Sequence, residues 1–160
     1  MKFLHGTDLV PTAEELAPLT EDQNLAILES LFLTVIVDGK VEQNEVKAFA
    51  LSALTYPWNW GQSPDVIKQK LDVIATKLKG TTRANMASYL KGIGGRIPSQ
   101  ALKEKTFAGM FSLMIADGKL DDKEKTAAIG FAGVFDIPQQ RAIELITNVM
   151  NALKAAAAKK

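Results

Sequence analysis

The sequence predicts an all-α protein, a multihelical single domain of about eight helices spanning residues 1–160. Three observations lead to this prediction. Apolar residues recur at the spacing of amphipathic helices, and the alternation typical of strands is nearly absent. Capping and helix-breaking residues stand where helices would begin and end. A short acidic phrase occurs twice, 79 positions apart, each time between two apolar helical runs.

The first two helices are marked by prolines and caps. A short helix is expected to begin at Pro11-Thr12 and to end at Pro18. Thr20 is a good N-cap for a long helix that runs to about Val37. The apolar spacing gives this helix a buried stripe of Leu25, Leu28, Phe32, Val35 and Ile36.

A third helix over about residues 42–54 is followed by an aromatic loop. The helix presents Val46, Phe49, Ala50 and Ala53 inward. Two prolines and a glycine make residues 55–64 a loop. Its aromatics Tyr56, Trp58 and Trp60 are expected to fold back over the core; the alternative is an exposed anchor for a partner.

The next two helices end at glycines. Ser63 caps a helix with Pro64 at its first position, and Gly80 closes it. Its apolar face consists of Ile67, Leu71, Ile74 and Leu78. Another helix is expected over residues 83–91, stopping at the glycine-rich run 92–95.

Three further helices complete the prediction. One starts at Ser99 and runs to a second Asp-Gly step, one runs from Asp121 to about Phe135, and one opens at Pro138. An alanine- and lysine-rich tail is expected over residues 150–160. The inward residues are Leu102, Phe107, Met110, Leu113 and Met114 in the first of these helices and Ile143, Ile146, Val149 and Met150 in the last.

The repeated phrase defines two related units. Residues 37–45 (VDGKVEQNE) correspond to residues 116–124 (ADGKLDDKE). The match extends into the flanking helices, where Phe32 corresponds to Phe111 and Ala53 to Ala132. We therefore expect two pseudo-symmetric helix–junction–helix units, at about residues 20–54 and 99–135.

Most of each junction has a structural explanation. Glycine suits the left-handed residue that ends a helix. Asp121 with Glu124 has the form of a capping box. Asp38 and Asp117 fit less well, because an anion at a helix C-terminus is unfavourable. A lysine, the amides of the next helix or an oxygen-ligated cation could compensate, although the spacing does not match an EF-hand.

The two phrases resemble the tellurite-resistance TerB family. The resemblance implies an all-helical, pseudo-symmetric fold and acidic junctions that bind a divalent metal such as calcium, magnesium or manganese. Carried over by position, the metal ligands are Asp38, Glu45, Asp117 and Glu124, with Glu42, Asp121 and Asp122 assisting. It also implies a role in tellurite resistance or another stress response.

Composition argues against most enzymes. The chain has no cysteine, and His5 is its one histidine, so thiolate nucleophiles, serine–histidine arrangements and nitrogen–sulfur metal sites lack their residues. No secretory signal or membrane-length apolar run is present, which favours a cytoplasmic protein without membrane insertion.

Charge is segregated along the chain. Acidic residues dominate positions 1–65, and basic residues dominate positions 66–105. We expect the basic middle to be a solvated helical face that pairs with the acidic first third. Nucleic-acid binding is not expected, because Tyr89 is the one aromatic among these basic residues and no stacking platform is evident.

The sequence therefore predicts a non-catalytic TerB-like protein that binds a divalent cation at its acidic junctions and acts through protein partners. The alternative is a metal-free helical interaction module, in which the junctions only cap helices and the aromatic loop or the basic middle holds a partner. A homodimer is possible on either reading.

Overall fold

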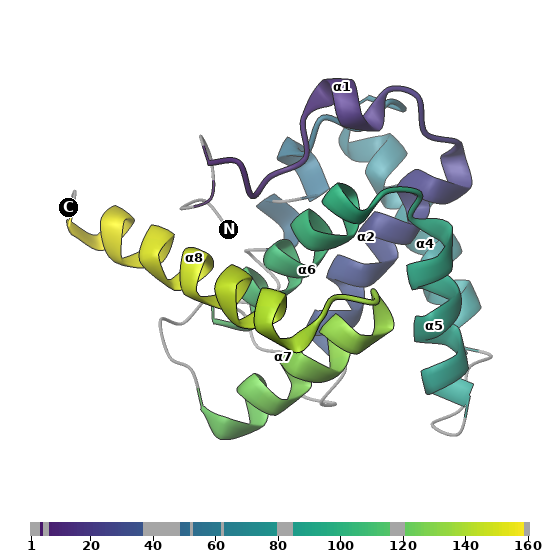
Figure 1. Ribbon diagram of the computed structural model, residues 1–160. Helices are drawn as coiled ribbons and strands as arrows, with labels where there is room; N and C mark the ends of the chain where they lie inside the picture. The colour runs from purple at the N-terminus through teal and green to yellow at the C-terminus, as the bar shows by residue number, and fades with distance from the viewer. Residues whose placement is uncertain are drawn as a thin grey trace.

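The computed structural model describes residue 4 and residues 7–36, 49–51, 53–61, 63–79, 85–115 and 121–158. These ranges contain helices and no strand, so the predicted all-α fold is confirmed (Figure 1). The helices are α1 (Ala13–Leu16), α2 (Glu21–Ile36), α4 (Pro64–Lys79), α5 (Met86–Arg96), α6 (Gln100–Met114), α7 (Asp122–Val134) and α8 (Gln139–Ala158). Residues 49–51 and 53–55 are also helical.

Two helices, α2 and α6, form the centre of the protein and pack against each other (Figure 1). Every residue of 24–31 in α2 and of 106–115 at the end of α6 is buried. A helix surrounded by protein needs apolar residues all round rather than on one stripe. The single stripe expected for α2 was therefore too narrow, since Ile27, Leu31 and Leu33 are buried as well.

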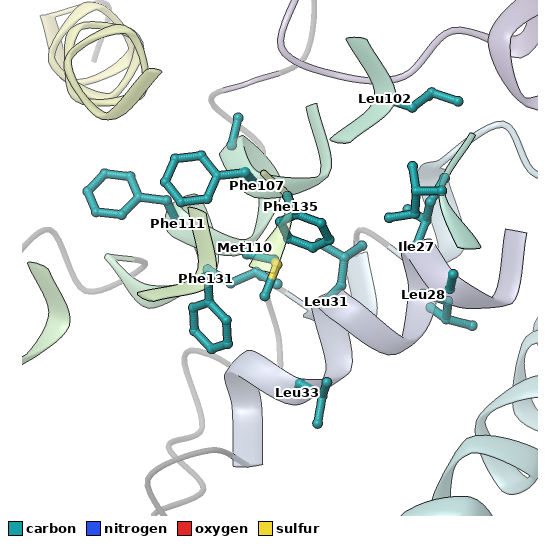
Figure 2. Close-up of a cluster of buried hydrophobic side chains, with 14 of the residues drawn as sticks. Ile27, Leu28, Leu31, Leu33, Leu102, Phe107, Met110, Phe111, Phe131 and Phe135 are labelled. Carbon is teal, nitrogen blue, oxygen red and sulfur yellow. The ribbon is translucent and has the colours of Figure 1, made fainter. Parts of the chain in front are cut away.

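The central core joins side chains from α2, α6 and α7. Figure 2 shows them gathering in one cluster, with Leu31, Met110 and Phe135 near its middle. All three are at most 1% exposed. Within the described ranges, none of the helices combines the length and the hydrophobicity that a membrane crossing requires.

Helix starts follow the predicted caps closely. The Thr20 hydroxyl accepts the Gln23 N–H at 3.1 Å, and the Gln23 side chain accepts the Thr20 N–H at 2.9 Å. The Ser99 hydroxyl accepts the Leu102 N–H at 3.1 Å at the start of α6. Because these bonds are local, they could be predicted from the sequence.

The glycine run at residues 92–95 does not end a helix, so that prediction was wrong. Helix α5 continues through the run to Arg96. A Cβ on Gly94 would lie 2.5 Å from the Val134 carbonyl oxygen of α7. The missing side chain lets the two helices approach closely, and this packing outweighs the low helix propensity of glycine.

The predicted C-terminal tail is helical through Ala158. Alanine has the highest helix propensity, and the partly buried Ala152 and Leu153 still pack against the core. The end of α8 projects from the rest of the bundle in Figure 1.

Candidate functional site

The second acidic junction is described where α7 begins. Asp121 is the N-cap of α7, and its carboxylate accepts the Glu124 N–H at 2.7 Å. Asp122 and Glu124 lie in the first turn, where the positive end of the helix dipole favours carboxylates. These three residues therefore meet the needs of a helix start.

The other four candidate metal ligands, Asp38, Glu42, Glu45 and Asp117, lie outside the described residues. Among the residues that are described, no three aspartate, glutamate or histidine side chains come close enough to hold a metal ion together. Of the predicted ligands, Asp121, Asp122 and Glu124 share the start of α7, but their carboxylates do not gather into a metal-binding group there.

The aromatic loop folds back over the core, as predicted, and is not an exposed anchor. Tyr56 and Trp58 are 1% and 4% exposed. The Trp58 indole N–H donates to the Ala53 carbonyl at 2.8 Å. Trp60 stacks on Trp58 with ring centroids 5.2 Å apart, and the Lys70 ammonium lies 5.1 Å from the Trp60 ring centroid. The loop thus covers one end of the core and joins it to α4.

The basic middle pairs with the acidic first third, as predicted, but the paired face is not fully solvated: Lys70 is 17% and Arg96 23% exposed, and Glu29 is buried. Ion pairs connect α4, α5 and α6 to α1 and α2. They are Lys70–Glu21, Lys77–Glu29, Arg96–Asp22, Arg96–Glu29 and Lys105–Glu15.

One of these carboxylates, Glu29, is fully buried in the middle of α2. Its two oxygens have different cations: Lys77 of α4 lies at 3.1 Å and Arg96 of α5 at 2.7 Å. Arg96 also reaches the carboxylate of Asp22 at 2.9 Å. The charge of Glu29 also acts on the hydroxyl of Tyr89 in α5, and we call these residues together the Glu29 cluster. Glutamate can be buried at this point because each oxygen is paired.

Sequence reasoning did not identify the Glu29 cluster. A usable signal was present, because Glu29 is the one charged residue within the otherwise uncharged stretch 23–37. A charged residue in a helix that is apolar on every side is almost never buried unless it is paired. Its partners lie 48 and 67 positions away, so the sequence alone could not name them.

The pKa values that depart from their ordinary values belong to side chains that are buried or hydrogen-bonded within the fold. Burial and the charge of Glu29 raise the pKa of Tyr89 to about 12, and burial raises the pKa of Tyr56 further. Burial also acts to raise the pKa of Glu15, but hydrogen bonds from Lys105 and the Thr12 N–H outweigh it and lower that pKa. Hydrogen bonds to Glu144 and Glu104 raise the pKa of Arg141.

An apolar groove lies between α2, the helical residues near 49–55, and α4. Its volume is about 510 Å³. It is lined by Phe32, Val35, Phe49, Ala50, Ala53, Leu54, Pro64, Ile67, Lys68 and Leu71. Lys68 is the charged residue of this set.

A second, more polar cleft of about 550 Å³ lies between α5 and α7. Gly95, Gly130 and Gly133 line it together with Val134, and Lys91 and Asp136 are its charged residues. Asp136 has a φ of 55°, and its neighbour Ile137 donates back to the Ala132 carbonyl at 2.9 Å, which is the usual left-handed ending of a helix. The cleft follows from the small residues along this helix pair.

No protein-family model matches this chain, and neither a curated protein nor a solved structure matches it. The TerB resemblance therefore stays a prediction that rests on the two acidic phrases.

Proposed function

We propose that this protein is a non-catalytic helical module that acts through a protein partner and needs no metal, in a stress response such as the tellurite resistance that the TerB resemblance implies. The observation that carries the metal-free version is the 2.7 Å hydrogen bond from the Glu124 N–H to Asp121. It gives the most prominent motif of the sequence a role within the fold.

The distribution of titratable groups supports a non-catalytic role. Active sites tend to hold groups with displaced pKa values inside a cleft. Among the residues that the structure describes, the displaced groups are Glu15, Tyr56, Tyr89 and Arg141, and none of these four lines the apolar groove or the polar cleft.

The internal contacts support a scaffold. On this proposal, α2 and α6 are the first helices of two pseudo-symmetric units, residues 20–54 and 99–135, and their mutual packing is the unit-to-unit contact. Ion pairs also connect α2, one of these two helices, to α4 and α5. A cytoplasmic module of this kind would present its outer helix faces to a partner or to a second copy of itself.

A second candidate function is binding of a divalent cation, calcium, magnesium or manganese, at the acidic junctions. Asp121, Asp122 and Glu124 place three carboxylates within four residues, and the same phrase recurs at Asp38, Glu42 and Glu45. Hard cations prefer such oxygen ligands. On this version Asp117 and Asp38 would complete the two sites.

Thermal unfolding after chelator treatment separates the two candidates. A cation at about a hundred times its dissociation constant adds ~2.7 kcal/mol, which is roughly 5–11 °C in midpoint for a chain of this length. The metal-free proposal expects no such rise with calcium, magnesium or manganese added singly. A rise that Asp121→Asn abolishes would overturn it, because asparagine keeps the cap but removes the charge.

Light scattering after size-exclusion chromatography tests the homodimer version. A monomer has a mass of 17.4 kDa. A doubled mass that persists on dilution would make a second copy the partner, and a monomer would direct the search to other proteins.

A further inference from the structure

The apolar groove is a site that the proposed function does not use. Phe32 and Val35 come from α2, Phe49 and Leu54 from the helical residues after the first junction, and Ile67 from α4. Three separate helices thus build one concave apolar surface. Its volume of about 510 Å³ falls in the range of small-molecule sites, roughly 300–1,000 Å³.

The lining is more open than that of a packed core. Ala50 is exposed, and Leu54 is 39% exposed, one of the large hydrophobic side chains that the described fold leaves accessible. Phe32 and Leu71 are partly buried, while Ile67 is only 4% exposed. The groove therefore has a buried floor and an accessible edge.

Lys68 gives this groove one charge. Its side chain is exposed. It forms no ion pair with any carboxylate of the described residues, whereas Lys70 and Lys77 of the same helix are paired. Asp65 and Asp72 lie one turn away on α4 and lower the local positive potential, but neither lines the groove.

The size of the groove favours a small ligand over a protein. Ten residues line it, whereas a standard protein interface takes roughly 20–30 residues a side. Nine of the ten lining residues are uncharged and one is a lysine. A ligand that complements this groove is therefore an elongated apolar molecule with a single negative charge at one end.

We propose that the apolar groove binds the hydrocarbon chain of a fatty acid, with the carboxylate at the Lys68 ammonium. The chain lies against Phe32, Phe49 and Ile67, where it removes apolar surface from water. The carboxylate stays at the rim, where Lys68 pairs with it and water solvates it. This inference is independent of the proposed partner and of the junctions.

Fluorescence of a dansyl-labelled undecanoate tests the proposal, with displacement by unlabelled acids below their micelle concentrations. Each CH₂ that enters the groove is expected to tighten binding about fourfold from octanoate to dodecanoate. Dodecanoate is expected to displace the probe better than dodecanol, and dodecyltrimethylammonium is expected to be weaker still.

Two variants locate the site. Ala50→Phe fills the groove from an exposed position and should abolish probe binding, whereas Ala101→Phe, on an exposed face of α6, should not. Lys68→Met should weaken dodecanoate up to about fivefold, the range of an exposed ion pair, and leave dodecanol unchanged. Lys125→Met, at an exposed lysine of α7, is the charge control.

Three results would overturn the proposal: no probe binding, binding that survives Ala50→Phe, or equal affinity of Lys68→Met and the parent protein for dodecanoate. Circular dichroism shows whether each variant keeps its helices. If Ala50→Phe does not fold, Leu54→Glu, at a 39% exposed position in the groove, serves the same purpose.

Discussion

Two carboxylates of this protein, Asp121 and Glu29, differ in how visible they are in the sequence and how deeply they are placed in the fold. Asp121 belongs to a repeated acidic phrase, yet it is exposed and bonds an amide three residues away. Glu29 belongs to no motif, yet it is fully buried and joins α2 to α4 and α5. A conspicuous motif thus serves a local need, and an inconspicuous residue holds distant helices together.

The physical cause is the distance over which each group acts. A cap needs only the amides of its own helix, so its signal is short and can repeat. A buried ion pair needs partners from other helices, and removing one partner leaves the others uncompensated. The comparison predicts that substituting Glu29, which belongs to no motif, destabilises the protein more than substituting Asp121, which belongs to the repeated phrase.

Glu29→Ala should have the largest effect. It leaves Arg96 and Lys77 without their shared carboxylate, at a cost of about 3 kcal/mol, which corresponds to a midpoint roughly 6–12 °C lower. Urea unfolding followed by circular dichroism measures the change in the free energy of unfolding, and a thermal scan measures the change in midpoint.

Glu21→Ala is the matched control for Glu29→Ala. Glu21 also lies on α2 and also pairs with a lysine of α4, Lys70, but its side chain is 66% exposed. An exposed pair contributes less than about 1 kcal/mol. Equal losses in the two variants would contradict the view that burial makes Glu29 important.

Asp121→Ala should have an intermediate effect, a loss of about 1 kcal/mol, because the first turn of α7 loses its cap. Asp121→Asn should stay within a few tenths of a kcal/mol of the parent, since asparagine caps equally well. The same urea titration measures both. If asparagine were as damaging as alanine, the charge of Asp121 rather than its cap would be what matters.

Tyr89→Phe should have a small effect near neutral pH, below that of Asp121→Ala and so less than about 1 kcal/mol, but it should change how stability falls at alkaline pH. Burial and Glu29 raise the Tyr89 pKa from 10.0 to about 12 in the folded protein. This contribution to stability is complete below pH 10 and is lost as the pH rises from 10 through about 12.

The free energy of unfolding measured between pH 9 and pH 12 checks this predicted fall in stability. The parent should lose stability more steeply than Tyr89→Phe, while the contribution of Tyr56 stays the same in both. Parallel curves would mean that the folded protein does not raise the pKa of Tyr89.

Much of the fold could be predicted because its signals are local. Thr20, Ser99 and Asp121 lie at helix starts as expected, and the spacing of Ile67 and Ile74 marked the buried face of α4. The glycine run in α5 was wrongly predicted to end a helix. Gly94 is needed there because the backbone of Val134, in α7, packs closely against it. Local propensity carries no information about such a contact.

The candidate sites divide in the same way. The cap at Asp121 and the inward aromatic loop were expected, whereas the Glu29 cluster and the apolar groove were not. The Glu29 cluster joins residues that are 48 and 67 positions apart, and the groove needs three helices between residues 32 and 71 to meet in space. Neither leaves a motif of its own.

The sequence by itself determined that this chain forms helices, where most of them begin, and that its acidic first third meets its basic middle, because propensity, capping and charge act over a few residues or over whole segments. Only the tertiary structure decided that residues 24–31 of α2 and 106–115 at the end of α6 are all buried, that Glu29 lies between two cations, and that Lys68 lines an apolar groove. Those features depend on which helix faces meet, and that is settled by packing all of the apolar surfaces together.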